Sequence, residues 1–434
     1  MKLWQKENTR TAEKIEAFTV GRDREFDLLL AKYDVQGSLA HIKMLSECGL
    51  MTREEEILAA EGLQQIADTI ESGKFMIDEG VEDVHSQVEF LLTRKIGETG
   101  KKIHAGRSRN DQVAVDIKLF LRDQALEIKK DVEGLFNILL EQSERNKNVL
   151  IPGYTHLQIA MPSSAGLWLG CYAESLVDDM ELLLAAYHII NKNPLGSGAG
   201  YGSSFPLNRR RTTELLHFRD LHWNAAYAQF ARGKTEKILS MALSSIAHTL
   251  SRLSMDCCLY ANQNFAFIQL PGEFTTGSSI MPHKKNPDVF ELIRGHCNRI
   301  QSLPNELTLL TSNLPSGYHR DMQLTKEILF PAIEQLKQCL QLTGIMVGKI
   351  EFRENILSEE KYKYLFSVEA VNELVKSGMP FRDAYKKTGE DIESGKFTYD
   401  QQQSLQHTHE GSIGNLCNNE IARQMKTIIE AFLH

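Results

Sequence analysis

Apolar residues recur every three or four positions over long stretches of this chain. Between residues 110 and 146 there is no proline and only one glycine. The apolar stripe of that stretch consists of Ile117, Leu121, Ile128, Val132, Phe136 and Leu139. A stripe with this spacing predicts an amphipathic helix. Similar patterns run over about 163–190, 235–262, 288–312 and 320–350. Helices of this length are typical of a bundle.

Some of these segments are apolar on more than one face. Examples are LLLAAYHII at 182–190 and the run over 238–260. A helix with two apolar faces is usually buried on both. We therefore expect the bundle to pack against other copies of the chain; the alternative is one large monomeric bundle.

The pattern divides the chain into three parts. Residues 1–103 hold shorter helical segments that start near Gly37 and Thr52, and residues 104–354 hold the long segments. Residues 355–434 return to short helices. Strand signals are weak, and the short run 265–270 is the example. The sequence predicts an all-α protein of three domains, with a small N-terminal domain, a central long-helix domain and a small C-terminal domain.

Composition narrows the class of protein. The 434 residues carry a net charge of −8, which does not favour binding to nucleic acid or to an anionic membrane. No apolar run approaches the roughly 20 residues of a membrane span, and the polar N-terminus does not resemble a signal peptide. The seven cysteines form no CxxC pair, which favours the reducing cytoplasm. No HExxH motif occurs, and we expect His407 and His409 to be solvated, so no metal is expected.

Four polar islands interrupt the long helices. The first, HAGRSRNDQ at 104–112, places Arg107 and Arg109 beside a helix N-terminus, where exposed N–H groups and the helix dipole favour anions. The arginines could bind a carboxylate. The alternative is that Asn110 or Asp111 only caps the helix and the arginines face solvent.

Two further islands follow. PGYTHLQ at 152–158 places Thr155 and His156 in a turn before a long helix, and histidine is the usual proton-transfer residue near neutral pH. A single loop histidine is, however, more often structural. PLGSGAGYGSS at 194–204 lacks the strand and the GK[ST] of a nucleotide-binding loop, so we expect its glycines to serve a tight connection.

The fourth island, GSSIMPHKKNP at 277–287, is the most specific feature of the chain. Lys284 and Asn286 precede Pro287, which opens the next predicted helix, and two serines lie in the small-residue part. A lysine, an amide and a helix N-terminus could together stabilise a developing dianion. The serines could close over a substrate. The alternative is a flexible surface loop.

These islands resemble a known family. GSSIMPHKKNP is similar to the signature of the fumarase/aspartase superfamily, and its MP-x-KKNPD form resembles the argininosuccinate lyase branch. Other segments resemble that family in the same order, over about residues 34–350. They are DVQGS (34–38), EDVH (82–85), GRSRNDQV (106–113), PGYTHLQ (152–158), PLGSGA (194–199) and YHRDMQ with Lys326 (318–326).

The resemblance implies an all-α fold with a central five-helix domain, four of which form a twenty-helix core. It implies a homotetramer in which each active site gathers residues from three subunits. The implied reaction is the reversible anti elimination of argininosuccinate to arginine and fumarate, by acid–base catalysis without a cofactor. The hard step is formation of a carbanion beside a carboxylate, so stabilisation of that charge is the main requirement.

Residue roles are carried over from the family by position. His156 and Ser278 become the acid–base pair, without an indication of which is the base, and Glu291 orients the histidine. Lys284 and Asn286 stabilise the dianion. The implied binding residues are Ser38, Asn110, Thr155, Tyr318, Gln323 and Lys326, with Arg109 and Asp83 as further candidates. Lys326 and Arg109 suit the substrate's carboxylates, and Tyr318 and Gln323 suit its arginine-derived end.

The sequence also departs from the family. Lys234 stands where the family usually has an aspartate, and His283 replaces a common glutamine. The first change reverses a charge and leaves room for a modified substrate, such as N-acylated argininosuccinate. Three competing hypotheses are an adenylosuccinate-type lyase, a non-catalytic relative like the δ-crystallins, and a helical scaffold protein.

Overall fold

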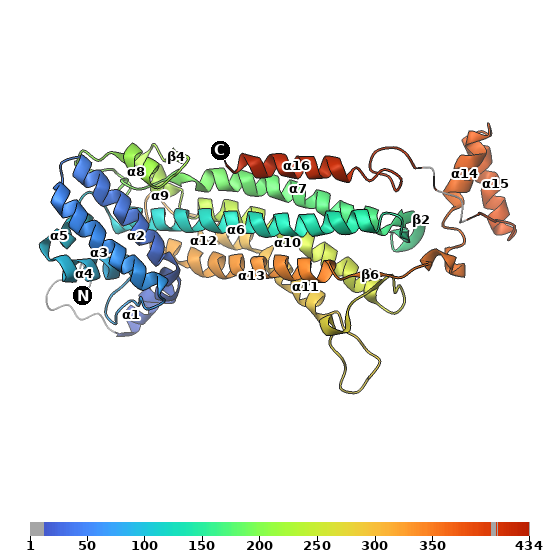
Figure 1. Ribbon diagram of the computed structural model, residues 1–434, viewed down its shortest axis with the longest axis horizontal. Coiled ribbons are helices and arrows are strands. Elements are labelled where there is room, and N and C mark those ends of the chain that lie inside the picture. Colours follow the sequence, from blue (N-terminus) through green and yellow to red (C-terminus); the bar gives the residue numbers. More distant parts are fainter. Residues whose placement is uncertain (1–12, 401–404, 406, 434) are drawn as a thin grey trace.

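The computed structural model describes residues 13–400, 405 and 407–433, and most of them are helical. The helices of its central part run side by side in one elongated bundle (Figure 1). They are α6 (Arg109–Arg145), α7 (Ala165–Ile190), α10 (Lys234–Ala261), α11 (Asp288–Ile300), α12 (Leu303–Leu310) and α13 (Leu324–Val347). The all-α prediction is confirmed, and each predicted long segment is helical.

The fourth long segment differs from its prediction in one detail. It forms two helices, α11 and α12, which are separated at Gln301 and Ser302. Pro304 lies in the first turn of α12. Proline has no backbone N–H and fits the start of a helix better than its interior, so the chain begins a new helix here.

The apolar stripe predicted on α6 is the buried face of that helix. Leu121, Ile128, Val132 and Leu139 are completely buried. Other large apolar side chains of the bundle stay exposed, among them Met255 on α10. Further exposed side chains are those of Met241, Leu292, Leu309 and Ile345. The bundle therefore has an apolar surface that this chain does not cover by itself.

The N-terminal helices gather at one end of the bundle, around the start of α6 (Figure 1). They are α1 (Glu13–Val20), α2 (Asp23–Glu47), α3 (Arg53–Glu71), α4 (Val84–Ile96), α5 (Glu98–Lys101) and η1 (Lys102–His104). Thr52 caps α3, as its predicted start requires. Gly37 lies inside α2 and does not start a helix; a Cβ there would come within 3.4 Å of Val115 Cγ1 on α6, so the glycine permits close packing.

Short strands and helices connect the bundle helices. The hairpin of β1 (Leu150–Thr155) and β2 (Gln158–Ser164) joins α6 to α7 at the far end. The remaining connecting elements are β3 (Lys192–Asn193), α8 (Arg209–Leu215), β4 (Asp220–Leu221), α9 (Ala225–Phe230), β5 (Ile268–Gln269), η2 (Gly272–Phe274), η3 (Arg320–Gln323) and β6 (Glu351–Phe352). β5 pairs with β6, so part of the run 265–270 is extended.

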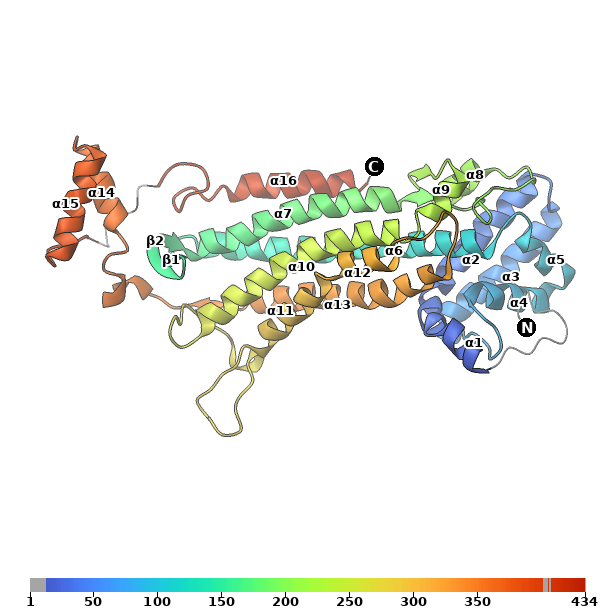
Figure 2. The ribbon, with the colours of Figure 1, turned by 180° about the vertical axis from the view of Figure 1, so that it is seen from behind.

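The C-terminal elements lie in two places. Helices α14 (Ser367–Lys376) and α15 (Phe381–Glu393) stand beyond the hairpin end of the bundle, and α16 (Asn418–Ala431) returns along α7 (Figures 1 and 2). The short turns η4 (Ile356–Ser358) and η5 (Glu360–Tyr362) precede them. None of the helices within the described ranges is long and apolar enough to cross a membrane.

Candidate active site

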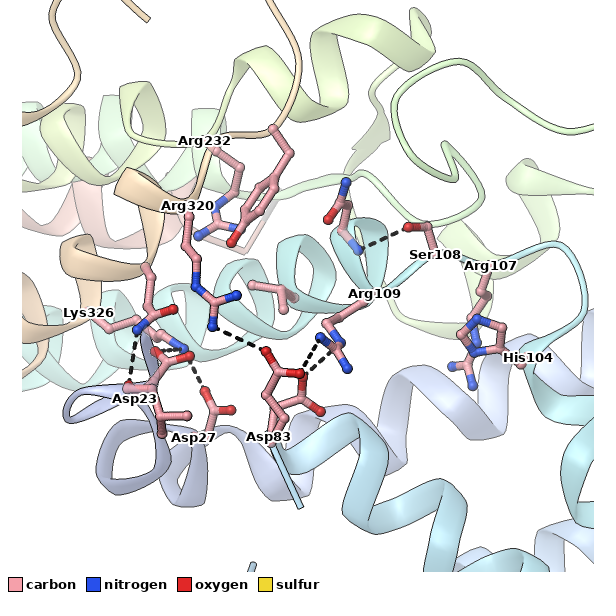
Figure 3. A pocket seen from close by; sticks show the side chains of 16 residues that line it. Asp23, Asp27, Asp83, His104, Arg107, Ser108, Arg109, Arg232, Arg320 and Lys326 are labelled. Carbon is pink, nitrogen blue, oxygen red and sulfur yellow. Dashed lines mark hydrogen bonds and ion pairs between the residues drawn. The ribbon is translucent and has the colours of Figure 1, made fainter. Parts of the chain in front are cut away.

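A pocket of about 440 Å³ opens where the N-terminal helices meet the start of α6. Its walls come from α2, the segment before α4, the start of α6, the α9–α10 connection, η3 and α13. Figure 3 shows that many of the side chains that line it are charged. The polar lining residues are Asp23, Asp27, Glu82, Asp83, His104, Arg107, Ser108, Arg109, Asn110, Arg232, Tyr318, Arg320, Gln323 and Lys326.

Six residues that the family resemblance assigns to substrate binding line this one pocket. They are Asp83, Arg109, Asn110, Tyr318, Gln323 and Lys326. They come from segments more than 200 residues apart in the sequence, and the fold brings them together. Ser38 is fully buried outside the lining, where its hydroxyl accepts a hydrogen bond from Arg107 Nη1 at 3.0 Å.

The start of α6 holds the first polar island in a fixed arrangement. Ser108 is the N-cap and forms a capping box with Asp111, so neither Asn110 nor Asp111 is the cap. Arg109 does not face open solvent, because its Nε lies 2.7 Å from Asp83 Oδ2 and its Nη1 lies 3.2 Å from Glu82 Oε2. Burial alone would raise the pKa of the Asp83 carboxyl. The nearby charges of His85 and Arg109 have the larger effect and lower that pKa.

A lysine and two carboxylates form the opposite wall. Lys326 Nζ lies 2.5 Å from both Asp23 Oδ1 and Asp27 Oδ1. Burial works against the charge of Lys326, but the two carboxylates raise its pKa overall. Burial, together with the charge of Asp27, raises the pKa of Asp23 to about 6 despite the lysine. One cation therefore does not fully compensate the two buried acids.

A buried cluster lies behind the pocket. His85 Nδ1 donates to Asp34 Oδ1 at 2.7 Å and lies 3.4 Å from Asp116 Oδ2. These three residues form the one group of described side chains with the spacing of a metal site. Burial disfavours the imidazolium, but Asp34 and Asp116 raise the pKa of His85 to about 9. With its pKa raised in this way, His85 is the counter-ion of the two acids.

The glycine-rich island wraps around a carboxylate of the protein itself. The N–H groups of Gly196 and Gly198 donate to Asp111 Oδ2 at 2.9 and 3.0 Å. Both glycines have positive φ values, 83° and 58°, which residues with a Cβ rarely adopt. The loop thus serves a tight connection, and Asp111 occupies the anion site that its N–H groups create.

The second island lies at the other end of α6. His156 and Leu157 form the two-residue loop of the β1–β2 hairpin, and both have positive φ values, 54° and 57°. Two such residues in succession are the mark of a type I′ turn, which favours Asn and Gly over larger residues. Thr155, His156 and Leu157 are all exposed. The strained turn presents His156 outward.

The fourth island is a loop that projects from the bundle before α11 (Figures 1 and 2). Its base is closed by Thr276 and Asn286, whose backbones exchange hydrogen bonds of 3.2 and 2.8 Å. Lys284 is exposed, and Ser278 Oγ accepts hydrogen bonds from the N–H groups of Ile280 and Met281 at 3.4 and 3.2 Å. Glu291 is exposed in the first turn of α11.

A single chain does not assemble these parts. Helix α6 has 37 residues and is therefore roughly 55 Å long. Arg109 begins it, and the hairpin with His156 follows its other end. Within the described part of the chain no hydrogen bond joins His156 to Ser278 or Glu291. Six of the residues that the resemblance assigns to binding form a pocket, and those that it assigns to catalysis lie elsewhere, on exposed segments.

Several pocket residues carry no sequence signal of function. Asp23 and Asp27 look like ordinary acids in the first turns of a helix, and Arg232 and Arg320 look like exposed arginines. The motif YHRDMQ could have indicated Arg320, because Tyr318 and Gln323 flank it. Lys234 does not line the pocket; its Nζ lies 5.8 Å from the centre of the Tyr227 ring.

The chain is similar in sequence to known lyases. A protein family described as "Lyase" matches residues 8–302. An argininosuccinate lyase of Bacteroides thetaiotaomicron is 60% identical over 432 residues, which are 99% of this chain and 96% of that protein. The argininosuccinate lyase of Thermotoga neapolitana is 40% identical over 389 residues, 90% of this chain and 98% of that protein.

Solved structures share the fold at low sequence identity. An EDDS lyase variant with bound fumarate superimposes with a TM-score of 0.74 at 21% identity, covering 98% of this chain and 91% of that one. A class II fumarase from Schistosoma mansoni gives a TM-score of 0.72 at 18% identity, covering 96% and 95%.

Proposed function

Because this chain belongs to the argininosuccinate lyase family, we propose that it splits argininosuccinate into arginine and fumarate without a cofactor. The pocket supports this proposal in addition to the sequence similarity. Six side chains that the family resemblance assigns to binding converge there. The N-acylated form of the substrate and adenylosuccinate are the competing substrates.

The reaction removes a proton from the carbon beside a carboxylate and then expels the guanidino nitrogen. The carbanion puts a second negative charge on that carboxylate, so preorganised donors contribute most of the catalysis. We assign this role to Lys284, Asn286 and the N-terminus of α11, which follow one another in the chain. Arg109 and Asn110 suit the succinate end of the substrate.

We assign removal of the proton to Ser278. Two backbone N–H groups already point at its Oγ. Such donors stabilise an alkoxide more than a hydroxyl, so they favour the deprotonated serine. His156, oriented by Glu291, is then the acid that protonates the leaving nitrogen. These assignments follow the family positions and the geometry of the loop.

We further propose that the active site forms between subunits of a homotetramer. The separation of His156 from Arg109 along α6 supports this, since one chain cannot bring both to one substrate. The exposed apolar side chains of the bundle, such as Met255 and Leu309, supply surface for the association. All seven cysteines are free thiols, which supports the cytoplasm as the compartment.

Fumarate absorbs ultraviolet light, so its release tests the reaction directly. Purified protein should produce fumarate from argininosuccinate, and His156→Ala and Arg109→Ala should each lose at least ~10²-fold of the rate. Adenylosuccinate serves as the specificity control. Absence of fumarate above the His156→Ala level would overturn the proposed function.

Mixing the two variants tests the shared site. If His156 and Arg109 of one site come from different subunits, some sites of a mixed tetramer receive both native residues. Activity should therefore return when the variants are expressed together. Mixing Arg109→Ala with Asn110→Ala is the matched control, because both residues lie on one chain's pocket and no site regains both. Equal results for the two mixtures would contradict the shared site.

A further inference from the structure

A small hydrogen-bonded cluster closes the base of the projecting loop that carries Ser278 and Lys284 (Figures 1 and 2). Its members are Thr276, on the chain that enters the loop, and Asn286 and Asp288, on the chain that leaves it for α11. We call these three residues the loop clasp. The backbone N–H groups of Thr276 and Asn286 each donate to the other's carbonyl, at 3.2 and 2.8 Å, so the two ends of the loop are tied together.

The side chain of Thr276 connects the other two members of the loop clasp. Its hydroxyl donates to Asp288 Oδ2, and the same oxygen accepts from Asn286 Nδ2 at 3.4 Å. A hydroxyl that donates to a carboxylate becomes a better acceptor, so the two bonds strengthen each other. Removal of this one hydroxyl would therefore release both an amide and a carboxylate.

The loop clasp orients the amide of Asn286 without satisfying it. Asn286 Nδ2 lies 3.4 Å from the Thr276 hydroxyl and 3.5 Å from the Gly277 carbonyl. Both bonds are weak, because N–H donors usually lie about 2.7–3.2 Å from their acceptors. A carboxylate that gains a second charge is a stronger acceptor and would take the same N–H groups. The amide is thus held in place but remains available to a substrate.

Asp288 is the first residue of α11 and stands where an acid can block the end of the helix. The N-cap is Pro287, whose side chain makes no capping hydrogen bond. The N–H groups of an uncapped first turn attract anions, and an aspartate of that turn can interact with them in place of a substrate. The hydrogen bond from Thr276 holds the Asp288 carboxylate at the loop base instead.

We propose that Thr276 is a positioning residue of the reaction, because its hydroxyl holds Asp288 away from the N-terminus of α11 and sets the amide of Asn286. The inference rests on the proposed function, in which the helix end and Asn286 stabilise the dianion. Loss of the hydroxyl should slow the chemical step. It should leave binding in the pocket largely unchanged, since pocket residues such as Arg109 belong to other segments.

Kinetic constants for fumarate release from argininosuccinate separate positioning from binding. Thr276→Val removes the hydroxyl and keeps the shape of the side chain. It should lower kcat by ~10-fold or more, while KM changes less than ~3-fold. Thr276→Ser keeps the hydroxyl and should retain kcat within ~3-fold. Thr275→Val is the matched control, because the Thr275 hydroxyl donates to the Gly272 carbonyl at 3.0 Å, outside the loop clasp, and its loss should leave kcat unchanged.

A second substitution tests the role of Asp288. In Thr276→Val the acid is free to approach the helix end, so adding Asp288→Ala should restore at least ~3-fold of the lost kcat. Adding Asp383→Ala, which removes an exposed acid from the first turn of α15, is the matched control and should restore nothing. A loop clasp that only stabilises the loop predicts the opposite result, a double variant slower than Thr276→Val alone.

Proteolysis gives a readout that does not depend on activity. Lys284 and Lys285 are exposed in the loop, and trypsin cleaves after lysine. A loop with a loosened base reaches a protease more easily, so trypsin should cut Thr276→Val at least ~3-fold faster at these lysines than the native protein. Thr276→Ser and Thr275→Val should be cut at the native rate. Thr276→Ala provides a second variant if Thr276→Val does not fold.

The outcomes distinguish the inference from the proposed function. No fumarate from the native protein would overturn the proposed function and, with it, the positioning role of Thr276. Normal cleavage of argininosuccinate with an unchanged kcat in Thr276→Val would overturn the inference alone. Equal losses in Thr276→Val and Thr276→Ser, an unchanged rate of loop proteolysis, or a double variant slower than Thr276→Val would do the same. A fall in kcat that Asp288→Ala partly restores, at an unchanged KM, would support the inference.

Discussion

The ionised Asp23 should make the folded protein less stable at neutral pH, so Asp23→Asn should stabilise it. Folding raises the pKa of Asp23 from 3.8 to about 6, chiefly through burial and the nearby charge of Asp27. Lys326 and Asp83 are the other charged groups that act on it. A group with a raised folded-state pKa binds its proton more tightly in the folded state. Stability is therefore lost as the pH rises from about 4 to 6.

The size of the effect follows from the shift. Two pKa units correspond to roughly 3 kcal/mol, and residual solvent contact reduces this to about 1–3 kcal/mol. For a chain of 434 residues the melting temperature should rise by about 1–3 °C at pH 7.5. Near pH 4 the native carboxyl is protonated, so the difference between the two proteins should disappear.

The assay is thermal unfolding of both proteins between pH 4 and pH 8, with Asp383→Asn as the control. A variant that melts below the native protein at pH 7.5 would show that the attraction of Lys326 outweighs burial, which refutes the reasoning. A stabilisation that is independent of pH would also refute it, because the gain would then not come from ionisation. Stability lost at a charged pocket residue is the usual cost of a preorganised site.

Two further residues give predictions of the same kind. Asp111→Ala removes the acceptor of three N–H groups, those of Ser108, Gly196 and Gly198. The free energy of unfolding should fall by about 3–5 kcal/mol. A large fall in melting temperature or in soluble yield would show this loss. His85 has its pKa raised to about 9 by Asp34, Asp116 and Asp83, so its stabilisation is complete below about pH 6.5 and is lost as the pH rises through 9. The melting temperature of the native protein should fall more steeply between pH 7 and 9.5 than that of His85→Gln. An equal fall in melting temperature for the two proteins over this pH range would contradict the prediction.

The long helices could be predicted because the spacing of apolar residues along the chain follows the buried face of each helix. The residues of the α6 stripe, such as Leu121 and Val132, repeat at helical spacing, and the structure buries them all. The division of the fourth long segment into α11 and α12 was missed, although Pro304 marks it. The role of Gly37 was also missed, since close packing against Val115 depends on another helix.

The pocket could be predicted only in part, because its recognisable residues lie in motifs and the others do not. Arg109 belongs to the first polar island, and Tyr318 and Gln323 belong to the segment YHRDMQ. Asp23 and Asp27 lie on a continuous helix, and their partner Lys326 follows Asp27 by 299 residues. No local pattern records a contact over that distance, so only the fold shows that these two acids share one lysine.

The residues that the family resemblance assigns to catalysis differ from those of the pocket, since one folded chain does not bring them together. His156 and Ser278 are exposed or half-exposed on a strained turn and on a projecting loop, whereas pocket residues such as Arg109 are held by ion pairs. A rigid pocket suits groups that must fix a substrate's charges. Segments that project from the bundle suit groups that must reach a substrate bound by another subunit. The exposure of His156 is therefore expected of a residue whose partners belong to other copies, and the mixed-variant experiment decides whether they do.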